Sequence, residues 1–98
     1  SSIVQSVSSD VNTIGYVGLG YAAEARDKVK VLPIKATADM PAVVPTDETV
    51  ANGTYSIARP LYLYTNGEPT GANAEFIAFC LSEEGQQIVR RAGYVQVK

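Results

Sequence analysis

The sequence predicts an α/β protein, in which strand-like segments alternate with segments that carry helix-capping residues. The strongest strand signal lies in residues 55–64, where apolar residues occupy both sides of a period-two pattern. Asn52-Gly53 precedes this segment and Asn66-Gly67 follows it, and both pairs are typical of turns. Two capped helical segments lie nearer the C-terminus. We therefore expect a strand that is covered on both of its faces.

Pro60 interrupts this strand in its middle. Proline has no N–H group, so the hydrogen-bond ladder must break there or run along an edge. A strand that is interrupted in this way can serve two sheets, one on each side of the proline. We therefore take residues 55–64 as the element around which the chain is organised.

The N-terminal half predicts one helix, one short strand and one helical turn. Apolar residues recur at roughly helical spacing and resemble the back end of a helix: Ile3, Val4, Val7 and Val11. Residues 13–17 predict a short buried strand, which ends at the glycines of residues 18–20. Residues 21–27 predict one helical turn.

The middle of the chain predicts a second short strand, a loop and a short helix. Residues 29–34 have strand character that is disturbed at Pro33, and residues 36–44 have the low patterning of a loop. Thr46 suits the cap of a helix, because its side chain can accept hydrogen bonds from free N–H groups. Gly53 suits the end of this helix.

The C-terminal part predicts two consecutive helices. Asn73 is the expected cap of a helix over residues 74–81, and Ser82 is the expected cap of a second helix after a break. Gly93 suits the left-handed position that follows the last helical turn. Arg90 and Arg91 lie in that turn, where positive charge interacts favourably with the negative end of the helix dipole. One apolar stripe is expected to be core: Ile77, Cys80, Leu81 and Ile88.

Composition limits the size and the partners of the protein. With 98 residues, 46% of them hydrophobic and 18% charged, the chain is long enough for one small globular domain. The net charge is −2 and Lys or Arg occur at most two in a row, so no nucleic-acid or anionic-membrane partner is predicted. The chain starts at Ser1, and we interpret it as a processed protein or a fragment.

The residue types do not favour catalysis, and we predict no enzyme, no metal and no cofactor. The sequence has no histidine, so it can build neither a Ser-His-Asp triad nor a histidine metal site. Cys80 suits an inert core thiol. The acid pairs Asp47-Glu48 and Glu83-Glu84 stand at helix starts, where capping and dipole effects explain them.

Two further features have a structural and a functional interpretation. The glycines of residues 15–20 stand in the reverse order of a dinucleotide fingerprint, so a tight turn where backbones approach is favoured over cofactor binding. Arg59 is the one charge inside the central segment. A structural ion pair is the favoured role of Arg59, and contact with an anion is the alternative, which makes it a weak candidate ligand residue.

Three stretches together resemble the C-terminal part of phosphate-binding proteins of ABC phosphate transporters, within the type II periplasmic binding proteins. They are residues 14–22, residues 55–64, and residues 76–89 with 93–95. The resemblance covers essentially the whole chain. Family members often have proline where Ser56 and Gln96 stand, and these differences leave the assignment intact.

The resemblance implies a two-lobed α/β receptor, with a mixed sheet and flanking helices, whose N-terminal part is absent from this chain. It divides the sequence into a portion of the second lobe (residues 1–54), a crossover strand (55–64) and a return to the first lobe with helices (65–98). It implies phosphate as the ligand and an ABC transporter permease as the partner of the intact receptor. The location implied is periplasmic or extracellular, with a lipid anchor allowed. The family's phosphate-binding motifs precede this segment, so no ligand residue carries over.

The alternative hypothesis is a structural or interaction fragment that folds or dimerises without binding phosphate. If the elements that cover the central strand and the C-terminal helices are missing, apolar faces and strand edges are left bare. A second copy carries the same faces. We therefore also predict a symmetric homodimer of the fragment.

Overall fold

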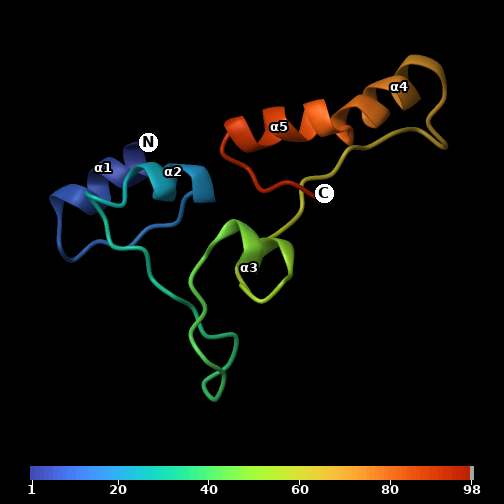
Figure 1. Ribbon diagram of the computed structural model, residues 1–98. Helices are drawn as coiled ribbons and strands as arrows, with labels where there is room; N and C mark the ends of the chain where they lie inside the picture. Colours follow the sequence, from blue (N-terminus) through green and yellow to red (C-terminus); the bar gives the residue numbers. More distant parts are fainter. Residues whose placement is uncertain (98) are drawn as a thin grey trace.

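A computed structural model describes residues 1–97, which form five α-helices joined by irregular segments. The helices are α1 (Ser2–Ser9), α2 (Leu19–Glu24), α3 (Asp47–Ala51), α4 (Gly71–Cys80) and α5 (Glu83–Arg91). Figure 1 shows α1 and α2 together on one side, and α4 and α5 following each other as a bent rod on the other. The chain between α2 and α3 protrudes as a loop over residues 35–43.

The predicted mixed sheet is wrong for the described residues. Within residues 1–97 the β-type pairing is a single antiparallel bridge, in which the N–H groups of Ile34 and Val43 each donate to the other residue's carbonyl at 2.9 and 2.8 Å. Residues 13–17 and 55–64 form no strand. The period-two pattern shows that a segment suits a sheet, but a strand exists only where a neighbour supplies hydrogen bonds, and neither segment has such a neighbour here.

The helix predictions are largely confirmed. α1 covers the N-terminal apolar repeat except Val11, which lies in the turn after it, and α2 begins two residues before the predicted turn. The Ser82 hydroxyl accepts a hydrogen bond from the Gly85 N–H at 3.2 Å, so the break between α4 and α5 is confirmed. The predicted start of α4 is wrong, because the chain leaves its extended conformation at Thr70 and Asn73 lies inside the helix.

A reciprocal capping box starts α3. The Thr46 hydroxyl accepts from the Thr49 N–H at 3.1 Å, and the Thr46 N–H donates to the Thr49 hydroxyl at 2.9 Å. Asp47 and Glu48 fill the first turn, where negative charge is favourable. Gly53 follows the helix with a φ of 79°, as its predicted role requires.

Replacing Thr46 with alanine is expected to destabilise α3 by about 1 kcal/mol, the usual cost of losing an N-cap side chain. Hydrogen exchange of the Val50 amide, which donates to the Thr46 carbonyl at 3.0 Å, measures this change. Thr70→Ala is the matched control, because Thr70 is the N-cap residue of α4 but its side chain forms no capping hydrogen bond. Equal effects of the two substitutions on their own helices would contradict the assignment.

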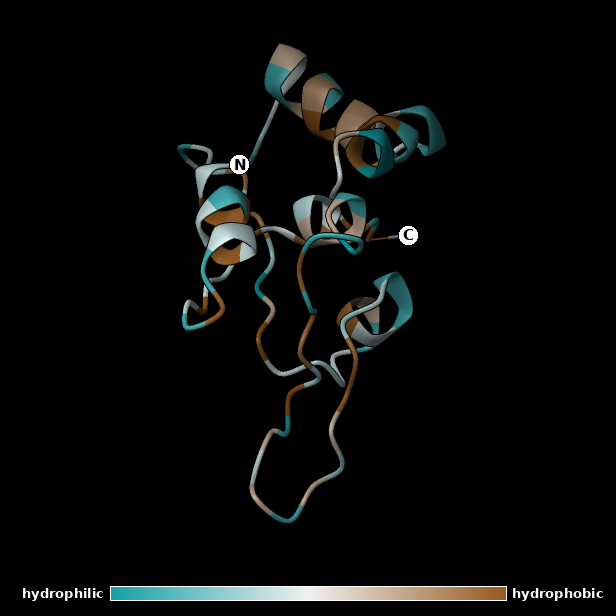
Figure 2. Ribbon diagram, turned by 90° about the vertical axis from the view of Figure 1, so that its left-hand side faces the viewer, coloured by the Kyte–Doolittle hydropathy of each residue, from teal (hydrophilic) through white to brown (hydrophobic). Residues whose placement is uncertain are grey.

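The chain encloses very little core. Among hydrophobic residues of the described chain only Ala25 is counted as buried, with 6% of its surface exposed. The predicted core stripe is therefore wrong in part: Ile77 and Cys80 are half-buried, but Leu81 and Ile88 are exposed. No second layer covers these helices, and Figure 2 shows hydrophobic residues distributed over helices and connecting segments alike.

The dimensions agree with this open arrangement. The radius of gyration is 16.7 Å, whereas a compact domain of this length has about 13 Å. The chain exposes 7981 Å² of surface, whereas a compact monomer of 10.4 kDa exposes about 5,400 Å². Among the described helices, none is long and apolar enough to cross a membrane.

Two contacts hold the helical parts together. The Gln86 side chain is 6% exposed; its amide nitrogen donates to the Cys80 carbonyl at 2.7 Å and its amide oxygen accepts from the Val97 N–H at 2.8 Å. Gln86 thereby fixes the C-terminal segment to the junction of α4 and α5. The Gly20 N–H donates to the Gly93 carbonyl at 3.2 Å, which joins the start of α2 to the end of α5.

Candidate functional site

Two open hollows border α1. The first has a volume of about 320 Å³ and lies between α1 and residues 13–16. Its lining combines four side chains that carry a hydroxyl group (Ser2, Ser6, Thr13 and Tyr16) with apolar side chains. Most of its lining residues are exposed, so a ligand there would stay in contact with water.

The second hollow, of about 610 Å³, carries the donor groups that an anion requires. Its lining is Ser1, Ser2, Val4, Gln5, Ser8 and Lys28. Hydroxyls, an amide and an ammonium group can all donate to an anion. The Ser1 side chain makes no capping hydrogen bond, so the first-turn N–H groups of α1 are not satisfied by that side chain. Every group except Val4 is exposed, so this arrangement provides charge and donors but little desolvation.

Sequence reasoning missed this second hollow. A pair of serines and one lysine, separated by more than twenty residues, are common in any sequence, and their proximity depends on how the chain folds back after α2. The signal that was available is the start of a helix beside Ser1 and Ser2, because helix starts favour anions.

Arg59 does not line either hollow. It is exposed on the segment between α3 and α4, and its side chain forms no hydrogen bond within residues 1–97. Both roles considered for Arg59, the ion pair and the anion contact, stay predictions.

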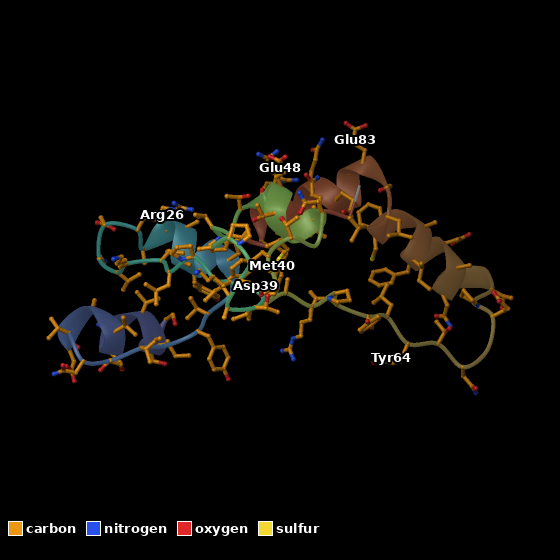
Figure 3. All side chains as sticks on the ribbon, turned by 90° about the horizontal axis from the view of Figure 1, so that it is seen from below. Arg26, Asp39, Met40, Glu48, Tyr64 and Glu83 are labelled. Carbon is orange, nitrogen blue, oxygen red and sulfur yellow. The ribbon has the colours of Figure 1, made fainter. Side chains whose placement is uncertain are left out.

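The acid pairs have the structural role that the sequence predicts. Asp47 and Glu48 lie in the first turn of α3, and Glu83 and Glu84 lie in the first turn of α5. Figure 3 shows Glu48 and Glu83 on these separate helices. Within the described chain, no group of three or more His, Cys, Asp or Glu side chains is placed to hold a metal ion.

The close backbone approach that was predicted for the glycine run is found at Gly20, whereas Gly15 approaches a side chain. A Cβ atom on Gly20 would lie 2.6 Å from the Gly93 Cα, and a Cβ atom on Gly15 would lie 2.6 Å from the Ile3 Cγ2. Both distances are shorter than real Cβ contacts allow. Gly20 is therefore required by packing against the backbone, whereas a side chain at residue 15 would require the Ile3 side chain to move.

One carboxyl group in the protruding loop has a shifted pKa. The Thr37 hydroxyl donates to the Asp39 carboxylate at 2.6 Å, and this bond, with a backbone hydrogen bond, lowers the pKa of Asp39. A lowered pKa means that the contact stabilises the loop above the ordinary pKa of aspartate. The stabilisation is lost as the pH falls through the lowered pKa. Asp39 is exposed at the surface of the loop.

Comparison with known proteins identifies the family. Residues 1–84 match the PBP superfamily domain. The chain is 36% identical over 99 residues to a protein of Pseudomonas aeruginosa named "Phosphate-binding protein PstS", covering 97% of this chain and 30% of that relative. Proteins of the same name from Staphylococcus epidermidis and Staphylococcus aureus are 36% and 35% identical over 98 residues, again covering 97% of this chain.

The chain spans only about three tenths of the length of these relatives. No solved structure matches the chain. The family match nevertheless covers most of the sequence, including α1 to α4 and the start of α5. The chain therefore belongs to the PBP superfamily, and the resemblance to phosphate-binding proteins that its three motifs predict is confirmed.

Proposed function

We propose that this chain is the C-terminal portion of a phosphate-binding receptor that serves an ABC-type phosphate importer. The observation that carries the proposal is the alignment of 97% of the chain, at 35–36% identity, with proteins named for phosphate binding. In this role the chain binds and does not catalyse, which agrees with the absence of histidine from its sequence.

The proposal assigns a part to each segment. Residues 1–54 belong to the second lobe of the receptor, residues 55–64 are the crossover between the lobes, and residues 65–98 return to the first lobe. The intact receptor passes phosphate to the transporter permease, and it works in the periplasm or outside the cell, where a lipid anchor can hold it. The break in regular structure at residues 55–64, between α3 and α4, supports their place as a connection.

The open hollows support a division of labour in phosphate binding. A phosphate ion that is held tightly needs several donors in a site that excludes water. The hollow at Ser1, Ser2 and Lys28 supplies donors without enclosure. We therefore expect most ligand groups, and the enclosing walls, to come from the part of the receptor that the relatives have in addition.

The isolated 98-residue chain is accordingly expected to bind phosphate weakly or not at all. Isothermal titration calorimetry with inorganic phosphate measures this. The alternative of a structural fragment predicts the same result for the isolated chain, so a second experiment has to separate the two. Micromolar affinity of residues 1–98 alone would contradict the proposed division of labour.

A chimaera provides that separation. In it, the matched 99 residues of the Pseudomonas aeruginosa relative are replaced by this chain. The chimaera is expected to bind phosphate within about tenfold of the parent, a change of roughly 1.4 kcal/mol. A folded chimaera that has lost phosphate binding would overturn the proposed function.

A further inference from the structure

The dipeptide Asn-Gly occurs twice in the chain, at residues 52–53 and at residues 66–67. Asparagine is chemically labile before glycine, because glycine has no side chain to hinder attack of its own nitrogen on the asparagine amide. All four residues are exposed. The two pairs therefore have the same intrinsic reactivity, and only their surroundings can make their reactivities differ.

The two glycines themselves are nearly identical. Gly53 has a φ of 79° and Gly67 has a φ of 81°. Nothing lies within 4 Å of the position that a Cβ atom would take on either glycine. Neither backbone conformation nor crowding of the glycine therefore distinguishes the two pairs.

Hydrogen bonds hold both reacting groups of the first pair. The Gly53 N–H donates to the Val50 carbonyl at 3.3 Å. The Asn52 Oδ1 atom accepts from the Thr54 N–H at 2.9 Å and from the Thr54 hydroxyl at 2.6 Å. Asn52 is also the C-cap residue of α3, and its own N–H donates to the Glu48 carbonyl. Ring closure at this pair would require several of these bonds to break.

The second pair lacks such restraints. Within residues 1–97, neither the Gly67 N–H nor the Asn66 side chain forms a hydrogen bond. The Thr65 hydroxyl donates to the Gly67 carbonyl at 2.8 Å, and this bond leaves the Gly67 nitrogen available. Figure 1 shows the chain reversing its direction in this region, just before it enters α4. The attacking nitrogen and the attacked amide are both accessible to water.

We propose that Asn66 is a site of spontaneous deamidation, from which Asn52 is protected by its hydrogen bonds. The Gly67 nitrogen loses its proton to solvent base and bonds to the Asn66 Cγ, and the side-chain nitrogen takes up a proton and leaves as ammonia. Water then adds to one of the two carbonyls of the cyclic imide and opens the ring. The product is aspartate or isoaspartate, and no group is oxidised or reduced.

The modification changes the turn between residues 57–64 and α4. Each event replaces a neutral amide with a carboxylate, so the net charge of −2 becomes more negative by one unit. In isoaspartate the main chain runs through the side-chain carbons, which adds one methylene to the backbone of the turn. The bond from the Thr65 hydroxyl to the Gly67 carbonyl spans this position, so isoaspartate at residue 66 alters its geometry.

Incubation in water enriched in oxygen-18 tests the proposal. The 98-residue chain is kept at mildly alkaline pH, digested in ordinary water and mapped by mass spectrometry, so that only events during the incubation carry the label. Labelled product at residue 66 is expected to form at least about tenfold faster than at residue 52, a ratio that corresponds to about 1.4 kcal/mol. In guanidinium chloride the two rates are expected to converge. Equal rates in the folded chain, or a difference that persists in denaturant, would overturn the proposal.

Removing one restraint tests why Asn52 is protected. Thr54→Val deletes the hydroxyl that binds Asn52. It is expected to accelerate labelling at residue 52 about fivefold, the factor that corresponds to the usual net contribution of one hydrogen bond. Hydrogen exchange of the Val50 amide checks that α3 persists in the variant.

Thr37→Val is the matched control, because it deletes a hydroxyl that binds Asp39 at the same distance of 2.6 Å in a different loop. It is expected to leave labelling at residue 52 unchanged. Asn66→Gln is expected to abolish the label at residue 66, since glutamine would have to close a larger ring. A rate at residue 52 that is no higher in Thr54→Val than in Thr37→Val would overturn the proposed protection.

Discussion

Replacing Gly85 with alanine is expected to separate α4 from α5 and to lower the free energy of unfolding by about 3 kcal/mol, the upper end of the usual cost of overpacking. Gly85 is buried in the first turn of α5. A Cβ atom there would collide with the Phe79 carbonyl oxygen and would lie 2.8 Å from the Cys80 carbonyl oxygen. Backbone atoms cannot swing away as a side chain can, so the helices themselves must move.

The same displacement would also disturb the neighbouring hydrogen bonds of the Gln86 side chain. Gln86 donates to the Cys80 carbonyl, and a shift of α5 lengthens that bond. Urea unfolding followed by far-UV circular dichroism measures the change in stability. Gly18→Ala is the matched control, because Gly18 has a φ of −59° and a Cβ atom there would meet only Tyr21, at an ordinary 3.7 Å. A loss for Gly85→Ala as small as that of the control would contradict this packing.

Gly20→Ala is expected to detach α1 and α2 from the end of α5, at a cost of about 2 kcal/mol, within the usual range for overpacking. An added Cβ atom would lie 2.6 Å from the Gly93 Cα and 2.7 Å from its carbonyl oxygen. The hydrogen bond from the Gly20 N–H to that carbonyl would be lost with the contact. Small-angle scattering should then give a larger radius of gyration for the variant than for the unsubstituted chain, whose Cα atoms have a radius of gyration of 16.7 Å.

A double-mutant cycle isolates this contact. Gly93→Ala alone is costly for a different reason, because Gly93 has a φ of 87° that alanine rarely adopts. If the two glycines touch as described, the effects of Gly20→Ala and Gly93→Ala are not additive, since the first substitution already breaks the contact. Additive effects would show that the two positions are independent.

Local features of this fold were predictable from sequence, and the reasons are visible at particular residues. The caps at Thr46 and Ser82 were correct because each satisfies free N–H groups within three residues of itself. The start of α4 was missed because Asn73 is as good a cap as any by composition. The backbone instead leaves its extended conformation at Thr70, three residues earlier.

The sheet was mispredicted for a different physical reason. Residues 13–17 and 55–64 have the residue types of strands, but a strand needs hydrogen bonds from a neighbouring segment, and pattern alone does not show whether that neighbour is present. The same applies to Leu81, which directly follows α4 and is exposed, because no layer among the described residues covers it. The role of Gln86 was unpredictable, since glutamine in a helix is usually exposed.

For the candidate site, the types of residue were easier to predict than their positions. The acid pairs and the close backbone approach at Gly20 were predicted correctly, because helix starts and close backbone contacts restrict residue type locally. The hollow at Ser1, Ser2 and Lys28 depends on how the chain folds back after α2. No single residue of this chain specifies a ligand class, and the proposal of phosphate rests on the names of the relatives.

The hydrogen bond between Gly20 and Gly93 has a kinetic consequence. It joins residues more than seventy positions apart, whereas the bond from Val97 to Gln86 spans eleven. Closing the longer loop costs about 2 kcal/mol more in chain entropy. During folding, the hairpin of α4, α5 and the C-terminal segment should therefore form first and the Gly20–Gly93 contact last. Gly20→Ala would then accelerate unfolding without slowing the formation of that hairpin.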